Sequence, residues 1–252
     1  MEKVSIVCLI YKSISYCDFL YANIHKYTPE IERGNVEFYF VANDATEEIL
    51  FHLNEMKYNH YINNNVKISE TELFNMGYAY PEYITRVYKG YNFGIKMAKN
   101  PIVVLINSDN AFSENWLENL LNKLNNNVVV SSRMIQPHNK FPNPKNNTLC
   151  EQYDFGKTLK EFNENTFINK VNELKTKTTS IGNAFMPLML YKKQAELVGY
   201  YPEGNLNNGS YNEISITGDH AFINKLEKNN ISHITSNDSI VYHFQEGEKY
   251  EK

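Results

Sequence analysis

The stretch Pro101–Leu121 reads PIVVLINSDNAFSENWLENLL and joins an apolar run to a polar turn and an amphipathic segment. Ile102 to Ile106 are five consecutive apolar residues, which predict a strand buried on both faces, as in a parallel sheet. The polar run of residues 107–110 follows at the carboxyl end of that strand. Ser113 is then a candidate N-cap for a helix with apolar side chains at helical spacing, namely Trp116, Leu117, Leu120, Leu121 and Leu124.

Asp109 is therefore placed where an open α/β sheet binds its ligands, just beyond the carboxyl end of a strand. At that position its carboxylate can meet a ligand or a metal ion. The alternative is that Asn107-Ser108-Asp109-Asn110 is a plain Asx turn without a ligand.

Apolar segments on both sides of this stretch alternate with predicted helices. Strands are expected at residues 4–10, 36–42, 128–132 and 239–244, with a weaker one at 60–68 or at 84–88. Helices are expected at residues 16–26, 91–98, 155–175, 194–198 and 218–226, with another around Ile49 to Leu53. This order predicts right-handed βαβ units, and therefore an α/β fold with a mixed, mostly parallel sheet between helices.

Composition excludes several classes of function. The net charge is −4 and the isoelectric point is about 6.0, so no chain-wide basic field favours nucleic acid. Cys8, Cys17 and Cys150 are widely spaced, which favours reduced thiols in an intracellular compartment over a disulfide framework or a zinc site. No signal peptide is expected at the start, and no apolar run approaches the roughly 18 residues of a transmembrane helix. The expected location is the cytoplasm, with attachment to a membrane surface left open.

Six motifs and one late histidine follow one another along the chain. Residues 4–11 form an opening strand and turn, and residues 43–48 fit N-D-G-S-x-D, with Ala45 and Thr46 in place of Gly and Ser. Residues 92–100 fit N-x-G-x-x-x-A-x-N, and residues 105–121 fit L-x-N-x-D-x-x-x-x-x-x-W-L-x-x-L-L. Residues 180–186 with 198–201, residues 218–222 and His243 come after them. In this order they resemble the nucleotide-sugar-dependent glycosyltransferases with the GT-A fold, family-2-like: residues 105–121 resemble the rhamnosyltransferase-like form of the D-x-D motif, and the last three resemble the acceptor-side strand with its continuation, the E-D-x-D-L region and the late histidine.

The resemblance implies a GT-A-like (Rossmann-like) three-layer α/β/α fold that forms one domain over residues 1–252. About residues 1–130 would bind the nucleotide sugar, and about residues 131–252 the acceptor. The implied reaction moves a hexosyl or deoxyhexosyl group from a UDP- or dTDP-linked donor to a hydroxyl group of a glycan, lipid-linked or protein acceptor. It would be inverting and would depend on Mn²⁺ or Mg²⁺. The sequence leaves open whether the chain forms a homo-oligomer.

Two residues are expected to hold the metal ion. A diphosphate needs a divalent cation held by few carboxylates, so that phosphates and waters complete its shell. Asp109 supplies one carboxylate, and a neutral His243 suits Mn²⁺ better than Mg²⁺. The family often has an acidic residue at the position of Asn107, and this chain departs from that pattern. The alternative for His243 is an ordinary structural histidine.

Further residues are expected to contact the donor, each with a structural alternative. Asp44 follows the second strand and can accept hydrogen bonds from a base or ribose, or cap a helix. Tyr11 can stack on the base or pack in the core. Asn92 and Gly94 permit a close approach of the backbone to the donor, or they form a turn. Ser108 belongs to the donor contacts together with Asp109.

Asp219 is expected to be the catalytic base. An inverting transfer needs a base that removes the proton of the acceptor hydroxyl as it attacks the anomeric carbon. Asp219 follows Gly218 at the start of a predicted helix, where the alternative is that Thr217 or Asp219 only caps that helix.

Two other functions stay open at this stage. One is a nucleotidyltransferase acting on sugar phosphates, which would be expected to carry a Gly- and Arg-rich loop after the first strand. Tyr11-Lys12-Ser13-Ile14 is not such a loop. The other is a non-catalytic sugar-nucleotide or glycan-binding protein. Residues 136–177, which are long for a connection and rich in Pro and Asn at their start, are expected to face the acceptor.

Overall fold

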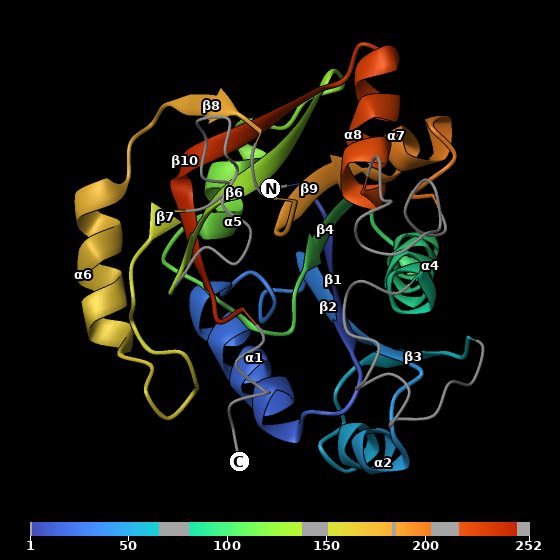
Figure 1. Cartoon of the computed structure of the whole chain (residues 1–252), viewed down its shortest axis with the longest axis vertical. Coiled ribbons are helices and arrows are strands. Elements are labelled where there is room, and N and C mark those ends of the chain that lie inside the picture. The colour runs from blue at the N-terminus through green and yellow to red at the C-terminus, as the bar shows by residue number, and fades with distance from the viewer. Residues whose placement is uncertain (1, 66–80, 138–150, 183–184, 203–216, 246–252) are drawn as a thin grey trace.

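A computed structural model describes residues 2–65, 81–137, 151–182, 185–202 and 217–245 of the chain. These residues form a ten-stranded sheet with helices on both of its faces (Figure 1). The strand order along the main path of the sheet is β3-β2-β1-β4-β9-β6-β10-β5. The bounds are β1 Val4–Ile10, β2 Val36–Asn43, β3 His60–Asn63, β4 Ile102–Ile106, β5 Asn110–Ala111, β6 Val128–Gln136, β9 Leu188–Tyr191 and β10 Ser232–His243.

The sheet is mixed but mostly parallel, as the sequence predicted. β3, β2, β1 and β4 form a parallel block. β9 is antiparallel to both of its neighbours, β4 and β6. β6 and β10 are parallel to each other and run in the same direction as the parallel block. Two short strands lie off the main path: β7 Glu151–Gln152 pairs with β6, and β8 Thr179–Ile181 pairs with β10.

The two faces of the sheet are covered by different helices, which confirms the three-layer prediction. α1 Ile14–Tyr27, α2 Glu47–Glu55 and α5 Trp116–Leu121 pack on one face, and α4 Pro81–Met97, α7 Lys192–Leu197 and α8 Gly218–Lys228 pack on the other. β1 shows the division: Ile6 and Cys8 belong to the first core cluster, and Val7 belongs to the second. α6 Glu164–Leu174 packs on a third, aromatic cluster at the end of β10.

Several element boundaries differ from the sequence predictions. Residues 84–88 belong to α4 and not to a strand, so the expected helix at 91–98 is the second half of a longer one. Ser113 does not cap α5, because its buried Oγ donates to the carbonyl of Ile240 at 2.6 Å; Asn115 is the N-cap, at φ 61°. Helix 155–175 was predicted too long, and α6 begins only after Asn163, whose side chain accepts from the N–H of Thr166.

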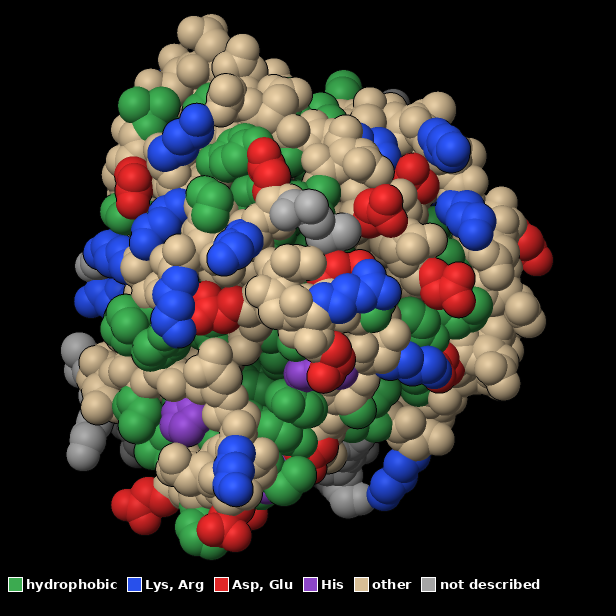
Figure 2. Space-filling model, turned by 180° about the vertical axis from the view of Figure 1, so that it is seen from behind, with side chains coloured by type: hydrophobic (Ala, Val, Ile, Leu, Met, Phe, Trp, Pro, Cys, Tyr) green, Lys and Arg blue, Asp and Glu red, His purple; other side chains and the backbone are tan. Residues whose placement is uncertain are grey.

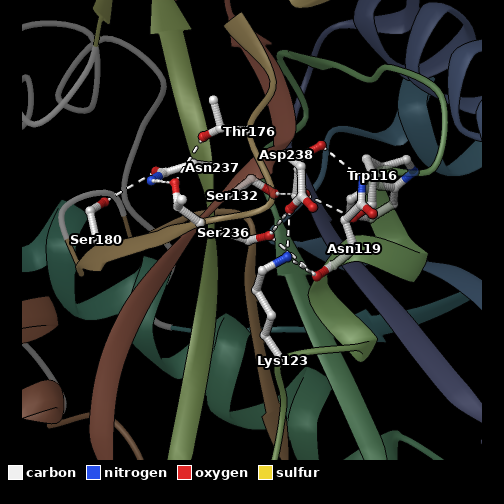
Figure 3. A network of polar contacts seen from close by, with 11 residues as sticks. Trp116, Asn119, Lys123, Ser132, Thr176, Ser180, Ser236, Asn237 and Asp238 are labelled. Carbon is white, nitrogen blue, oxygen red and sulfur yellow. Dashed lines mark hydrogen bonds and ion pairs between the residues drawn. The ribbon is translucent and has the colours of Figure 1, made fainter.

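A bulge divides β10 into two halves. Ser236 pairs with Ser132 and Ile240 with Arg133, so residues 237–239 stand outside the pairing with β6. Figure 3 shows what holds this bulge: Lys123 forms a 2.5 Å ion pair with Asp238, and Asn119 Nδ2 donates to the carbonyl of Asp238 at 2.8 Å. An odd shift of register changes which face each following side chain meets. The bulge therefore sets where the last residues of β10 lie.

The surface carries no large single-sign field on the face seen in Figure 2, where acidic and basic side chains are intermixed. Of the three cysteines, Cys8 and Cys17 are free and buried, and Cys150 lies outside the described residues. Among the helices that the structure describes, none has the length and apolar character needed to cross a membrane.

Candidate active site

One edge of the sheet gathers the residues that the sequence singled out. β1, β2, β4 and β10 all run in the same direction, so their carboxyl ends meet at this edge. Tyr11 and Asp44 follow β1 and β2 directly, Asp109 follows β4 closely, and His243 ends β10. The topology thus brings together residues that are up to 232 positions apart (243 minus 11).

Asp109 and His243 are in direct contact. His243 Nε2 lies 3.2 Å from Asp109 Oδ1 and 3.4 Å from Asn107 Nδ2, and His243 and Asp109 are both mostly buried. On the other side of the ring, His243 Nδ1 lies 3.3 Å from Gln136 Oε1. Because the amide oxygen of Gln136 can only accept, it favours a proton on Nδ1, and with a cation bound Nε2 would then be a lone-pair ligand; without a cation, the Asp109 carboxylate would itself accept a proton from Nε2.

These residues fit a divalent cation. Two neighbouring ligands of an octahedral ion, each about 2.1 Å from it, lie about 3 Å apart. The 3.2 Å between Asp109 Oδ1 and His243 Nε2 matches that spacing. Within the described ranges, no group of three or more His, Cys, Asp and Glu residues is arranged to hold a metal ion. From the part of the chain that the structure describes, Asp109 and His243 would be the two strong ligands, and phosphate oxygens and waters could take other positions.

Asn107 is fixed by the helix that crosses this edge. The hydroxyl of Tyr91, on α4, donates to Asn107 Oδ1 at 3.0 Å, and the backbone N–H of Asn107 donates to Asn110 Oδ1 at 2.9 Å. The amide oxygen of Asn107 is therefore already bonded to Tyr91. Asn107 is neutral, so Asp109 supplies the one carboxylate of this turn. Ser108 is half-buried in the same turn.

Asp44 is paired with an arginine that the sequence analysis did not identify. Arg86 Nε donates to Asp44 Oδ2 at 2.8 Å, and the backbone N–H of Asn65 donates to Asp44 Oδ1 at 2.5 Å. The guanidinium carbon lies 5.6 Å from the centre of the Tyr11 ring. Asp44 and Arg86 are each about nine-tenths buried, and Arg86 Nη1 is buried without a hydrogen-bond partner. Tyr11, Asp44 and Arg86 thus form one polar cluster beyond β1 and β2.

Asn92 and Gly94 have structural partners. Asn92 is buried, donates to the carbonyl of Tyr201 at 2.9 Å and accepts from its N–H at 3.0 Å. A Cβ atom on Gly94 would lie 2.4 Å from Val7 Cγ1, so glycine lets α4 approach β1. Both residues lie inside α4 and not in a turn, and their expected contact with a donor stays a prediction.

Asp219 lies in the first turn of α8, whose N-cap is Thr217, so it is not the capping residue. The hydroxyl of Tyr88 donates to Asp219 Oδ2 at 3.3 Å. Burial raises the pKa of Asp219 to about 6, and the hydrogen bond from Tyr88 opposes that rise. A half-buried carboxyl group with a pKa near neutrality can accept a proton at physiological pH, as a general base must.

α4 connects the three groups of residues. Arg86, Tyr88 and Tyr91 lie on this helix and contact Asp44, Asp219 and Asn107 respectively. Tyr88 and Tyr91 are one turn apart, and both rings lie against the ring of Tyr201.

Gln136 and Arg86 are the residues that sequence reasoning missed. Gln136 could have been found only if the expected strand at residues 128–132 had been extended through Met134 and Ile135, because Gln136 ends β6. Nothing in the local pattern distinguished Arg86.

Comparison with known proteins identifies a family pattern in the middle of the chain. Residues 84–196 match the model of glycosyl transferase family 2, which confirms the resemblance seen in the sequence motifs. The matched segment includes most of α4, all of β4 and the turn with Asp109. No curated protein matches the chain.

Two solved structures share the fold. One is the mannosyltransferase PcManGT from Pyrobaculum calidifontis in complex with GDP-Man and Mn²⁺, with 14% identity, a TM-score of 0.56, and coverage of 98% of this chain and 59% of that one. The other is TarS 1-349 of S. aureus, with 16% identity, a TM-score of 0.56, and coverage of 96% of this chain and 60% of that one. The chain thus spans about 60% of the length of these structures, and at such identities the likeness is one of fold.

Proposed function

Because residues 84–196 carry the sequence pattern of glycosyl transferase family 2 and the whole chain has the fold of such enzymes, we propose that this protein is a glycosyltransferase. It transfers a sugar from a nucleoside-diphosphate donor to a hydroxyl acceptor. The observation that carries the proposal is the edge of the sheet described above. There the candidate metal ligands Asp109 and His243, the polar cluster around Asp44 and the carboxyl group of Asp219, whose pKa is raised, lie along one helix, α4.

The polar cluster of Tyr11, Asp44 and Arg86 is the proposed base site. The carboxylate of Asp44 can only accept hydrogen bonds, and the buried Arg86 Nη1 can only donate one. An acceptor beside a donor matches an N–H next to a C=O, which uracil, thymine and guanine present on one edge. Cytosine and adenine instead place an amino donor beside a ring-nitrogen acceptor, so they would pair with the same two groups only with the base turned differently relative to the ribose. The Tyr11 ring, which lies beside the Arg86 guanidinium, is proposed to stack on the base. UDP- and dTDP-linked donors fit this site, and so does the GDP-linked type that the mannosyltransferase binds.

Asp109 and His243 are the proposed metal ligands, with Gln136 orienting the histidine ring. When bound, Mn²⁺ or Mg²⁺ would neutralise the diphosphate and stabilise its charge as it leaves. The mannosyltransferase with the shared fold was solved with Mn²⁺.

Asp219 is the proposed general base of an inverting transfer. Its carboxylate removes the proton of the acceptor hydroxyl while that oxygen forms a bond to the anomeric carbon. The bond from the anomeric carbon to the diphosphate oxygen breaks at the same time, and the nucleoside diphosphate leaves. About residues 1–130 would then serve the donor and about residues 131–252 the acceptor.

Residues 136–177 remain proposed as an acceptor-facing segment. Part of the segment lies outside the described residues. In the described part, Phe167 and Val171 of α6 are buried in the aromatic cluster, and Glu164 forms an ion pair with Lys26 of α1. A test of acceptor use should therefore vary the exposed side chains of α6 and spare Phe167, Val171 and Glu164.

A thermal-shift screen tests the donor site directly. UDP, dTDP, GDP, CDP and ADP would each be added with and without Mn²⁺. A nucleotide at 100 times its dissociation constant adds about 2.7 kcal/mol of stability, which is roughly 5–10 °C in Tm for a chain of this size. We expect this shift with Mn²⁺ for at least one of UDP, dTDP and GDP, and a much smaller one for CDP and ADP.

The matched variants are Arg86→Gln, which removes the free donor, and Arg33→Gln, which alters an exposed arginine paired with Glu30. The first should lose the nucleotide-dependent shift and the second should keep it. No shift with any nucleotide, or an equal shift with CDP and ADP, would contradict the proposed base site.

A further inference from the structure

Tyr88 makes two hydrogen bonds to Asp219 with a single hydroxyl group. Its oxygen donates a proton to Asp219 Oδ2 at 3.3 Å and accepts one from the backbone N–H of Asp219 at 3.1 Å. That N–H is one of those that a helix N-terminus leaves without an intrahelical partner. Thr217, the N-cap of α8, makes no capping hydrogen bond with its side chain. Tyr88 therefore does from α4 what a capping side chain would do within α8.

The Tyr88 ring is held in place by close packing. A Cβ atom on Gly218 would lie 2.2 Å from Tyr88 Cε2, so the glycine lets the start of α8 rest on the ring. The ring stacks on Tyr201, with centroids 5.5 Å apart, and Tyr201 stacks on Phe222 of α8 at 4.0 Å. Asn92 fixes the backbone of Tyr201 through two further hydrogen bonds. The hydroxyl of Tyr88 thus has a defined position relative to both helices.

Resting on the proposed function, we propose that Tyr88 is a positioning residue that orients the Asp219 carboxylate and keeps it ionised for proton transfer. Because Tyr88 binds Oδ2, Oδ1 is the oxygen that takes the proton of the acceptor hydroxyl. The hydroxyl of Tyr88 itself does not exchange its proton in the reaction.

The groups around Asp219 are consistent with this role. In the described part of the chain, the titratable groups that face it are Tyr88 of α4 and Tyr201, and His220 follows it on α8 with Nδ1 2.7 Å from Thr217 Oγ1. Burial raises the pKa of both tyrosines, so Tyr88 stays protonated and remains a donor. Burial also raises the pKa of Asp219, and the bond from Tyr88 is the interaction that lowers it. Removing the hydroxyl should therefore raise the pKa of Asp219 further.

The pH dependence of transfer in Tyr88→Phe tests this inference. The acid limb of the kcat profile should move to higher pH by about one unit, which corresponds to losing one hydrogen bond to a charged group. Turnover should approach that of the wild type at high pH, where Asp219 is ionised in both proteins. Tyr39→Phe is the matched control, because it removes another buried hydroxyl, which donates to the carbonyl of Gly94 on α4 at 2.7 Å. Its acid limb should not move.

Titration of the carboxyl carbon of Asp219 by ¹³C NMR, in the full chain, separates this inference from the proposed function. The signal is assigned by its absence in Asp219→Asn. A higher midpoint in Tyr88→Phe than in the wild type supports the role of Tyr88 even if no transfer is detected. Equal midpoints in the two proteins would overturn it. If the wild type transfers no sugar from any donor tested, the proposed function fails, whatever the titration shows.

Discussion

The buried ion pair at the β10 bulge gives a prediction about stability that does not depend on activity. Lys123 and Asp238 are 2.5 Å apart, and their side chains are 14% and 12% exposed. Lys123→Met removes one charge, leaves the carboxylate of Asp238 buried, and also deletes the bond from Nζ to the carbonyl of Asn119. Breaking a buried pair from one side costs about 3–5 kcal/mol.

We expect a loss near the lower limit, about 3 kcal/mol, because both side chains keep some contact with solvent. Asp238 Oδ1 also keeps its hydrogen bond from Ser236 Oγ at 2.7 Å. In a chain of this size that loss lowers Tm by roughly 6–12 °C. Urea unfolding of wild type and variant, followed by circular dichroism, measures the difference in the free energy of unfolding.

Two comparisons make the assay specific. Lys170→Met breaks a pair in which Glu173 is 66% exposed and also removes the contact of the ammonium with the Tyr153 ring, 4.5 Å from its centre, so it should change the free energy of unfolding by about 1 kcal/mol or less. The double variant Lys123→Met/Asp238→Met replaces both charges with apolar groups and should recover a large part of the loss. A loss below about 1 kcal/mol for Lys123→Met, similar to that of the exposed control, would refute the view that this pair holds the bulge.

Three further outcomes are expected. Asp219→Asn should lower transfer by about 10²–10⁴-fold yet add about 1–3 kcal/mol of stability at pH 7.5 and little near pH 4, because burial raises the pKa of Asp219 to about 6, so the stability that the protonated carboxyl group gives at low pH is lost as the pH rises through 6; chemical unfolding at the two pH values measures this. Burial lowers the pKa of His233 to about 4, so its neutral form favours folding above pH 6.5 and this stability is lost on acidification towards pH 4; His233→Gln should flatten that decline in unfolding free energy, and an unchanged slope would exclude His233 as its source. Gly94→Ala should lower the free energy of unfolding, measured in urea, by about 1–3 kcal/mol, since its Cβ would lie 2.4 Å from Val7 Cγ1; an increase would contradict the close packing of α4 on β1.

Most of the fold follows from local patterns. Apolar runs such as Val4–Ile10 and Ile102–Ile106 are too short for helices and lie at βαβ spacing, so strand positions and the parallel block were predictable. The candidate site follows from the same rule, because parallel strands place their carboxyl ends at one edge. This is why Asp109 and His243, far apart in sequence, lie in contact at one edge, whereas their role as metal ligands was suggested by the family resemblance and stays a prediction.

The remaining features depend on contacts that no local pattern records. The side chain of Ser113 bonds to Ile240 and that of Asn92 to Tyr201, each over more than a hundred residues. The prediction of Ser113 as a helix cap and the alternative of a turn at Asn92 were therefore wrong. Arg86 was missed because residues 84–88 also fitted a strand. The first half of β10 was missed because Ser232–Ser236 mixes polar and apolar residues, and its bulge is held by side chains of α5 and the residues after it.

The central claim is that this chain transfers sugar with Asp219 as base and a cation held by Asp109 and His243. The most direct measurement is the release of nucleoside diphosphate from the nucleotide sugar whose base stabilises the protein, in the presence of Mn²⁺ and an acceptor alcohol. We expect release by the wild type, its loss after chelation or in Asp109→Ala, and a fall of about 10²–10⁴-fold in Asp219→Asn with donor binding retained. Wild-type turnover in the Asp219→Asn variant would contradict the account.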